Sequence, residues 1–152
     1  MLRILVVCSA NICRSPLGAA VLQTVLPRGA VKISSAGVQA LSGNSADPIV
    51  VELARERGYV DLSGHRSQAL LSGTLSGVDL VLCMAASQRD QLLREQPTMT
   101  GRIRLYADMP PRDVADPTGR SRADYLACLD LIERSAMQWP GRLVQAGLLT
   151  GP

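Results

Sequence analysis

The first sixteen residues constrain the fold more than any other part of the chain. Leu2–Val7 is a nearly continuous apolar run, which is typical of a strand buried on both faces of a parallel sheet. A loop follows at Cys8–Arg14, and Ser15-Pro16 then combines an N-cap residue with a proline at the first helical position. We therefore expect a buried strand, a short loop and a helix in immediate succession.

The rest of the chain repeats this alternation of strand and helix. Further strands are expected at Val31–Ser35, Asp79–Met84 and Arg102–Tyr106, and helices at Pro16–Leu26, Asp47–Gly58, Ser87–Glu95 and Ser121–Val144. Strands that alternate with helices form right-handed βαβ units around a parallel sheet. The sequence predicts a single α/β domain over residues 1–152, with a four-stranded parallel sheet and helices on both faces.

The charge and aromatic content argue against nucleic-acid binding. The net charge is +3, but the 16 basic residues, of which Lys32 is the only lysine, are scattered along the chain. The chain has three Tyr, one Trp and no Phe, so it offers few rings on which bases could stack. We expect no nucleic-acid partner.

No stretch of the chain looks like a membrane or export segment. No apolar run approaches the roughly 20 residues of a membrane span. The start, Met1–Cys8, lacks the full apolar region and cleavage site of a secretory signal. We expect a cytoplasmic protein without membrane insertion, whose four cysteines form no structural disulfides. With His65 as the one histidine and no paired cysteine motif, no metal or cofactor is expected.

The loop after the first strand has the features of a phosphate site. Ligands of such sheets bind at the carboxyl ends of the strands, where helix N-termini favour an anion. The seven residues of Cys8–Arg14 can wrap so that their N–H groups point at phosphate oxygens, and Arg14 adds a bidentate fork. The same field favours a Cys8 thiolate, the form in which cysteine is a nucleophile. The expected phosphate-binding residues are Ser9, Ala10, Asn11, Ile12, Cys13, Arg14 and Ser15.

The bare spacing of cysteine and arginine is weak evidence. It occurs three times, at Cys8/Arg14, Cys83/Arg89 and Cys128/Arg134. Cys128 lies inside the last predicted helix, where no loop can form. Cys83 also ends a strand before a helix, but a capping box of Ser87 and Asp90 would place Arg89 in the first helical turn, and Asp90 would repel phosphate. Only the first match has the right context.

Residues 7–16 as a whole resemble the phosphate loop of low-molecular-weight protein tyrosine phosphatases. Further motifs follow in the family's order: Ser35-Ala36-Gly37, Gly64-His65, Leu80–Met84 and Asp116-Pro117. Ala46-Asp47-Pro48 and Glu133–Trp139 are similar to the bacterial branch linked to capsule and exopolysaccharide systems. The resemblance covers nearly the whole chain and implies metal-independent hydrolysis of phosphotyrosine through a phosphocysteine intermediate.

The resemblance also implies roles for individual residues. Cys8 would attack phosphorus, Arg14 would bind the phosphoryl oxygens, and Asp116 would protonate the leaving phenolate, whose conjugate acid has a pKa of about 10. Asp116 would then deprotonate the water that hydrolyses the intermediate. Asp113 is the local rival acid, but it is not followed by proline and does not match the family's acid.

Four further residues match or extend the family's supporting network. Ser15 would cap the helix and donate a hydrogen bond to the Cys8 thiolate, while Asn11, Ser35 and His65 would hold the loop in shape. Without the resemblance, these last three would be read as a loop residue, a strand end and a surface histidine. Cys13 could trap an oxidised Cys8 as a reversible disulfide, or could simply fill space beneath the loop.

The chain departs from the family at several positions near the expected site. Ala10 replaces the usual glycine, so a positive φ there would cost strain. Gly18 and Ala19 occupy the region of a carboxylate early in the first helix, and Ala85 replaces an acidic residue. Thr118 stands where tyrosine is usual and cannot form an aromatic wall for the substrate ring.

The resemblance to the bacterial branch further implies that the substrate is a phosphotyrosine protein, namely an autophosphorylating bacterial tyrosine kinase of polysaccharide export. We expect the enzyme to be a monomer. Two alternatives stay open. An arsenate reductase would need a cysteine relay, for which Cys83 is available, but position 90 is Asp90 and Cys13 would have to substitute. A non-catalytic phosphotyrosine- or phosphate-binding module would need neither Cys8 nor Asp116.

Overall fold

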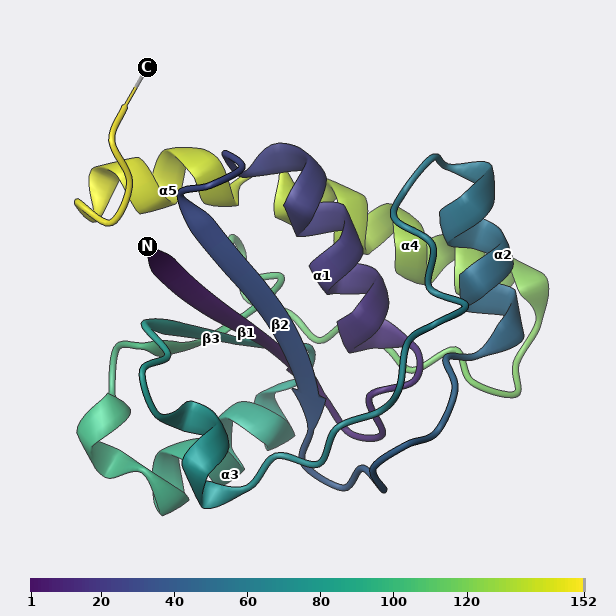
Figure 1. The fold of residues 1–152 in the computed structure, drawn as a ribbon, viewed down its shortest axis with the longest axis horizontal. Coiled ribbons are helices and arrows are strands. Elements are labelled where there is room, and N and C mark those ends of the chain that lie inside the picture. Colours follow the sequence, from purple (N-terminus) through teal and green to yellow (C-terminus); the bar gives the residue numbers. More distant parts are fainter. Residues whose placement is uncertain (152) are drawn as a thin grey trace.

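A four-stranded parallel sheet forms the centre of the protein in the computed structural model, which describes residues 1–151 (Figure 1). The strands are β1 (Leu2–Cys8), β2 (Val31–Gly37), β3 (Leu80–Cys83) and β4 (Ile103–Leu105). Their order in the sheet is β2-β1-β3-β4, and every neighbouring pair is parallel. This agrees with the sheet that the alternation of elements predicts.

The two central strands are buried on both faces, as their apolar composition predicts. In β1, the side chains of Ile4, Leu5, Val6 and Val7 are at most 1% exposed, and all of β3 is buried. Edge strand β2 alternates between half-buried and exposed residues over most of its length. Continuous burial of β1 places the end of this strand, and hence Cys8, deep in the molecule.

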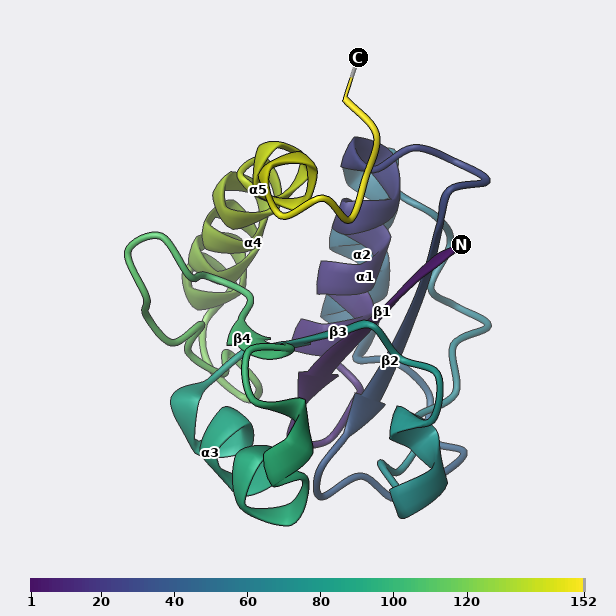
Figure 2. The same ribbon diagram turned by 90° about the vertical axis from the view of Figure 1, so that its left-hand side faces the viewer.

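Helices cover both faces of the sheet. The helices are α1 (Arg14–Val25), α2 (Pro48–Glu56), α3 (Ala86–Glu95), α4 (Arg122–Ala136) and α5 (Trp139–Gln145), with short 3-10 helices at Ser72–Leu75 and Pro97–Met99. Figure 2 shows α1, α2, α4 and α5 on one side of the sheet and α3 on the other. One apolar cluster joins Ile4 and Val6 to the first group, and a second joins Leu5 and Val7 to Leu92 of α3. The predicted fold class is confirmed.

The last predicted helix is wrong in one respect, because Ser121–Val144 forms two helices. The chain leaves α4 at Met137 and begins α5 at Trp139. Pro140 explains the break, because it has no N–H to donate to the Ala136 carbonyl and its ring would clash with that carbonyl in a continuous helix. The Trp139 indole N–H donates to the Tyr106 carbonyl over 2.9 Å and anchors α5 to the end of β4.

Two predicted helix caps also differ from the structure. Helix α1 begins at Arg14 rather than Pro16, so Ser15 lies inside the first turn and does not cap it. At α3 the capping box of Ser87 and Asp90 is absent; instead, the Gln88 side chain accepts a hydrogen bond from the Ala85 N–H over 2.9 Å. The predicted cap at α2 is confirmed, because Asp47 accepts from the Ile49 N–H.

The strand order sets where a ligand can bind. From β1 the chain moves outward to β2 on one side, and it later returns to place β3 on the other side of β1. Loops leaving two strands on opposite sides of such a point diverge and open a crevice at their carboxyl ends. The loop Cys8–Arg14 lies at this point. Across residues 1–151, none of the helices is long and apolar enough to cross a membrane.

Candidate active site

The loop after β1 offers a set of free backbone donors. The N–H groups of Ser9, Ala10, Ile12 and Cys13 make no hydrogen bond to another atom of residues 1–151. They precede α1, whose positive dipole end lies at Arg14. Free N–H groups at a helix N-terminus favour a phosphate group, so this loop can offer several donors to such a ligand.

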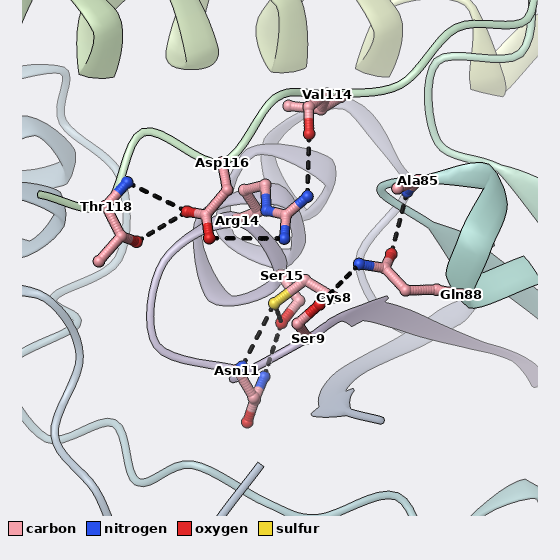
Figure 3. Close-up of polar contacts among 10 residues, drawn as sticks. All are labelled: Cys8, Ser9, Asn11, Arg14, Ser15, Ala85, Gln88, Val114, Asp116 and Thr118. Carbon is pink, nitrogen blue, oxygen red and sulfur yellow. Dashed lines mark hydrogen bonds and ion pairs between the residues drawn. The ribbon is translucent and has the colours of Figure 1, made fainter. Parts of the chain in front are cut away.

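The Cys8 sulfur lies among hydrogen-bond donors at the base of this loop (Figure 3). Its Sγ is 2.9 Å from the Ser15 hydroxyl and accepts from the Asn11 N–H at 3.3 Å. Cys8 itself is only 2% exposed. Donors that point at sulfur stabilise its negative charge, which a nucleophilic thiolate requires. Ser15 thus contacts Cys8 as predicted.

Asn11 holds the loop in shape through both its backbone and its side chain. Its φ of 57° is the one positive value among the non-glycine residues that the structure describes. The Asn11 amide donates to the hydroxyls of Ser15 (2.7 Å) and Ser35 (3.0 Å) and accepts from the Gln68 N–H (2.8 Å). Its carbonyl accepts from His65 Nε2 at 2.7 Å. The structure therefore brings together all four residues of the predicted network.

The expected strain at Ala10 does not occur. The left-handed conformation falls on Asn11, one residue later, and asparagine tolerates that conformation better than most residues. Alanine in place of glycine at position 10 therefore adds no backbone strain to the loop.

Arg14 joins the phosphate loop to the loop that follows β4. Its side chain is buried, and Nη1 donates to the Val114 carbonyl at 3.0 Å. The Val114 N–H in turn donates to the Met84 carbonyl at 2.7 Å, just beyond β3. With Nη1 engaged in this way, Nε and Nη2 are the pair of donors that Arg14 can offer to two phosphate oxygens.

Asp116 lies beside Arg14 with its carboxylate held on one side. Oδ1 accepts from the Thr118 N–H (3.1 Å) and hydroxyl (2.7 Å), and Oδ2 is 3.8 Å from Arg14 Nη2. Partial burial raises the pKa of the carboxyl, but the two bonds from Thr118 and the charges of Arg14 and Arg120 outweigh it and hold the pKa below its usual value. Figure 3 shows the carboxylate between Thr118 and Arg14.

The rival acid and the rival cysteine both lie elsewhere. Asp113 accepts a hydrogen bond from the Ala86 N–H at 2.9 Å, at the start of α3. Cys83 is fully buried, and burial raises the pKa of its thiol to about 12. It also belongs to the apolar cluster on the α3 face of the sheet, whereas Cys8 belongs to the cluster on the α1 face. A cysteine relay from Cys8 to Cys83 would therefore have to cross the sheet.

Cys13 is buried beneath the loop, beside Cys128 of α4. Hydrogen bonding with Cys128, together with burial, raises the pKa of the Cys13 thiol. This environment matches the space-filling alternative for Cys13. Residues 1–151 contain no group of three or more His, Cys, Asp or Glu side chains arranged to hold a metal ion.

Sequence reasoning missed two residues that shape the loop. Gln88 is buried, and its amide donates to the Ser9 hydroxyl at 3.2 Å, so α3 supports the phosphate loop directly. Gly37 lies so close to the loop that an added Cβ would be 2.4 Å from the Ser9 carbonyl oxygen and 3.0 Å from the Asn11 nitrogen. The motif Ser35-Ala36-Gly37 carried the signal for Gly37, whereas no sequence signal distinguishes Gln88 from an exposed helical glutamine.

Comparison with known proteins identifies relatives along nearly the full chain. The model of the family described as low molecular weight phosphotyrosine protein phosphatase matches residues 3–147. The probable low molecular weight protein-tyrosine-phosphatase EpsP of Ralstonia nicotianae is 38% identical over 144 residues, which cover 95% of this chain and 97% of that protein. The low molecular weight protein-tyrosine-phosphatase Wzb of Escherichia coli is 36% identical, with 90% and 91% covered.

Two solved structures share this fold over nearly the whole chain. Vibrio vulnificus Wzb in complex with benzylphosphonate superimposes with a TM-score of 0.86 at 35% identity, covering 93% of this chain and 99% of that one. The YwlE arginine phosphatase from Geobacillus stearothermophilus superimposes with a TM-score of 0.87 at 28% identity, covering 100% and 99%.

Proposed function

The chain belongs to the low molecular weight phosphotyrosine protein phosphatase family, and from this membership we propose that Cys8, Arg14 and Asp116 together hydrolyse phosphotyrosine. The resemblance noted in the sequence is thereby confirmed, and the chain is a protein-tyrosine-phosphatase, a hydrolase of a family that needs no metal. One observation carries the assignment of roles. A cysteine with two donors on its sulfur, a row of free N–H groups and a buried arginine meet at one loop, and a carboxylate reaches the same arginine.

The first step transfers the phosphoryl group to Cys8. The Cys8 thiolate attacks phosphorus, the bond from phosphorus to the phenolic oxygen breaks, and Asp116 gives its proton to the departing oxygen. The N–H groups of the loop and the free donors of Arg14 hold the three remaining oxygens. The products are a tyrosine hydroxyl and a phosphocysteine.

The second step releases phosphate. The Asp116 carboxylate accepts a proton from a water molecule, whose oxygen attacks phosphorus while the bond to Cys8 sulfur breaks. The thiolate that leaves is stabilised by the Ser15 hydroxyl and the Asn11 N–H. Inorganic phosphate departs, and Asp116 again carries the proton needed for the first step.

Hydrolysis of a phosphotyrosyl peptide in EDTA tests this function directly. We expect steady release of phosphate, and a phosphocysteine on Cys8 when the reaction is quenched in acid during turnover and analysed by mass spectrometry. The proposal fails if no phosphoryl group is found on Cys8 or if turnover requires an added metal. A phosphoarginine peptide belongs in the same assay, because one structural relative is named an arginine phosphatase. We expect faster hydrolysis of the phosphotyrosyl peptide.

We further propose that the physiological substrate is an autophosphorylating tyrosine kinase of polysaccharide export, and that the enzyme acts as a monomer formed by one domain over residues 1–152. The similarity of Ala46-Asp47-Pro48 and Glu133–Trp139 to the bacterial branch linked to these systems supports the pathway. Because a kinase takes its phosphoryl groups from ATP, this substrate places the enzyme in the cytoplasm. Phosphoproteomics of a deletion strain should show increased tyrosine phosphorylation of that kinase; unchanged phosphorylation would contradict the proposal.

A further inference from the structure

We propose that Thr118 is a positioning residue for the acid: its hydroxyl binds Oδ1 of Asp116, so that Oδ2, the oxygen facing Arg14, carries the proton used in the reaction. This inference rests on the proposed role of Asp116 as the general acid. From the sequence, Thr118 is notable only because it lacks the aromatic ring that is usual at this position; the structure shows that its hydroxyl contacts the acid.

The two carboxylate oxygens of Asp116 have different surroundings. Oδ1 accepts two hydrogen bonds, from the Thr118 N–H and the Thr118 hydroxyl, at 3.1 and 2.7 Å. Oδ2 has no partner that close, because Arg14 Nη2 is 3.8 Å away, beyond hydrogen-bond distance. A proton on Oδ1 would have to displace one of the two donors, whereas a proton on Oδ2 displaces nothing. Oδ2 is therefore the oxygen that is protonated.

The hydroxyl is what residue 118 contributes beyond its backbone. Any residue except proline supplies the N–H, but only threonine or serine supplies this short donor in the same place. The Asp116 side chain is 51% exposed, so packing alone does not fix its rotamer. The second bond to Oδ1 limits rotation of the carboxylate and keeps Oδ2 on the side of the phosphate loop, as Figure 3 shows.

The charges around Asp116 make the effect of the hydroxyl testable. The charges of Arg14 on α1 and Arg120 of the same loop lower the pKa of the Asp116 carboxyl, and the charge of Asp116 in turn acts to raise the pKa of the Cys13 and Cys128 thiols. Against this background, the bonds from Thr118 favour the ionised acid and lower its pKa. Removing the hydroxyl must therefore raise the pKa of Asp116 and leave more of it protonated. If the hydroxyl acted only on the pKa, its removal would speed the hydrolysis of esters with poor leaving groups; if it positions the acid, removal slows it.

The decisive variants are Thr118→Val, which keeps the shape but removes the hydroxyl, and Thr118→Ser, which restores it. Thr100→Val is the matched control, because the Thr100 hydroxyl also donates within an exposed turn, to the Pro97 carbonyl. We expect Thr118→Val to reduce kcat/KM for phenyl phosphate by about 3–10-fold, the value of one hydrogen bond. A nitrophenyl phosphate, whose leaving group needs little protonation, should be affected less than roughly twofold, which corresponds to about 0.4 kcal/mol. Thr118→Ser and Thr100→Val should behave like the wild type.

A carboxyl NMR titration gives the second measurement, with Asp116→Asn used to assign the signal. The pKa of Asp116 should be higher in Thr118→Val than in the wild type or in Thr118→Ser. The inference is overturned if Thr118→Val speeds phenyl phosphate hydrolysis, slows both esters equally, or is not rescued by Thr118→Ser. If Asp116→Ala itself slows both esters equally, the proposed acid is wrong; if it slows phenyl phosphate selectively while Thr118→Val does not, only the positioning role is wrong.

Discussion

Oδ2 of Asp116 lies 3.8 Å from Nη2 of Arg14, so the proposed acid borders the arginine that is expected to bind phosphate. Arg14 also donates to the Val114 carbonyl, two residues before Asp116. The loop that carries Val114 and Asp116 is thus held against the phosphate loop before any substrate is present. Phosphate bound at Arg14 would place its leaving oxygen beside the acid, and such preorganisation is a large source of catalytic rate.

Cys8→Ser should abolish turnover of an aryl phosphate. A cysteine attacks as a thiolate, whereas a serine hydroxyl at this position keeps its proton and is a much weaker nucleophile. The variant should still bind phosphate or vanadate, measured by calorimetry, since the N–H groups and Arg14 remain. Cys83→Ser is the matched control and should keep its rate within a few-fold, because Cys83 faces the other side of the sheet. An inactive Cys83→Ser beside an active Cys8→Ser would show that the loop assignment is wrong.

Asp116→Ala should slow hydrolysis of phenyl-type esters by roughly 10² or more, as expected for the loss of general acid catalysis. Esters of more acidic phenols should lose less. Asp113→Ala should have little effect, because Asp113 binds the start of α3. Equal losses on both kinds of ester, or a comparable loss in Asp113→Ala, would remove Asp116 from this role.

The low pKa of Asp116 predicts a pH dependence of the same reaction. An acid must carry its proton to act, and a lowered pKa means that the proton is lost at lower pH than from an ordinary aspartate. For phenyl phosphate, kcat/KM should therefore fall as pH rises above the lowered pKa. The profile of Asp116→Ala should lack this fall, whereas a fall retained in that variant would assign it to another group.

Gly37→Ala should disturb the phosphate loop, because the new Cβ would lie 2.4 Å from the Ser9 carbonyl oxygen. Overpacking of this kind costs about 1–3 kcal/mol of unfolding free energy, and a displaced loop should reduce kcat/KM roughly 10-fold or more. Gly73→Ala is the control, since no atom of residues 1–151 beyond its two chain neighbours lies within 4 Å of its added Cβ. Thermal unfolding and kinetics of the two variants should differ clearly; equal behaviour would mean that the loop can move aside.

Thr118→Tyr should supply the aromatic wall that the chain lacks. None of its own aromatic residues offers a free ring: Tyr106, Tyr125 and Trp139 are buried, and Tyr59 donates to Glu133. Ring contact of about 0.5–1.5 kcal/mol should lower KM for an aryl phosphate roughly 2–10-fold. Because the substitution also removes the hydroxyl from Asp116, Thr118→Val is the proper reference for kcat. An unchanged KM would show that residue 118 does not line the cleft.

Much of the fold follows from local sequence patterns. The apolar runs at β1 and β3, the Asp47-Pro48 cap of α2 and the alternation of strands and helices are local signals. Local signals were also enough to place Cys8 and Arg14 together, because both belong to one short loop between a strand and a helix. They failed where one side chain has several possible partners: Ser15 lies inside the first turn of α1, and its hydroxyl bonds Cys8 and Asn11 instead of capping the helix.

Only the tertiary structure decided how distant loops meet at the site. Asp116 follows β4, the edge strand farthest from β2, and it reaches Arg14 because Val114 is bound both to Arg14 and to the end of β3. Local context already favoured Cys8 over Cys83, but only the structure shows that their side chains occupy opposite faces of the sheet. Thr118 and Asp116 are only two residues apart in the sequence. Their contact can position the acid only because Arg14 lies on the other side of the carboxylate. The sequence by itself determined which reactive groups share one loop, because spacing along the chain is a local property. The distances between groups on different loops depend on strand order and packing, which act between residues far apart in the chain.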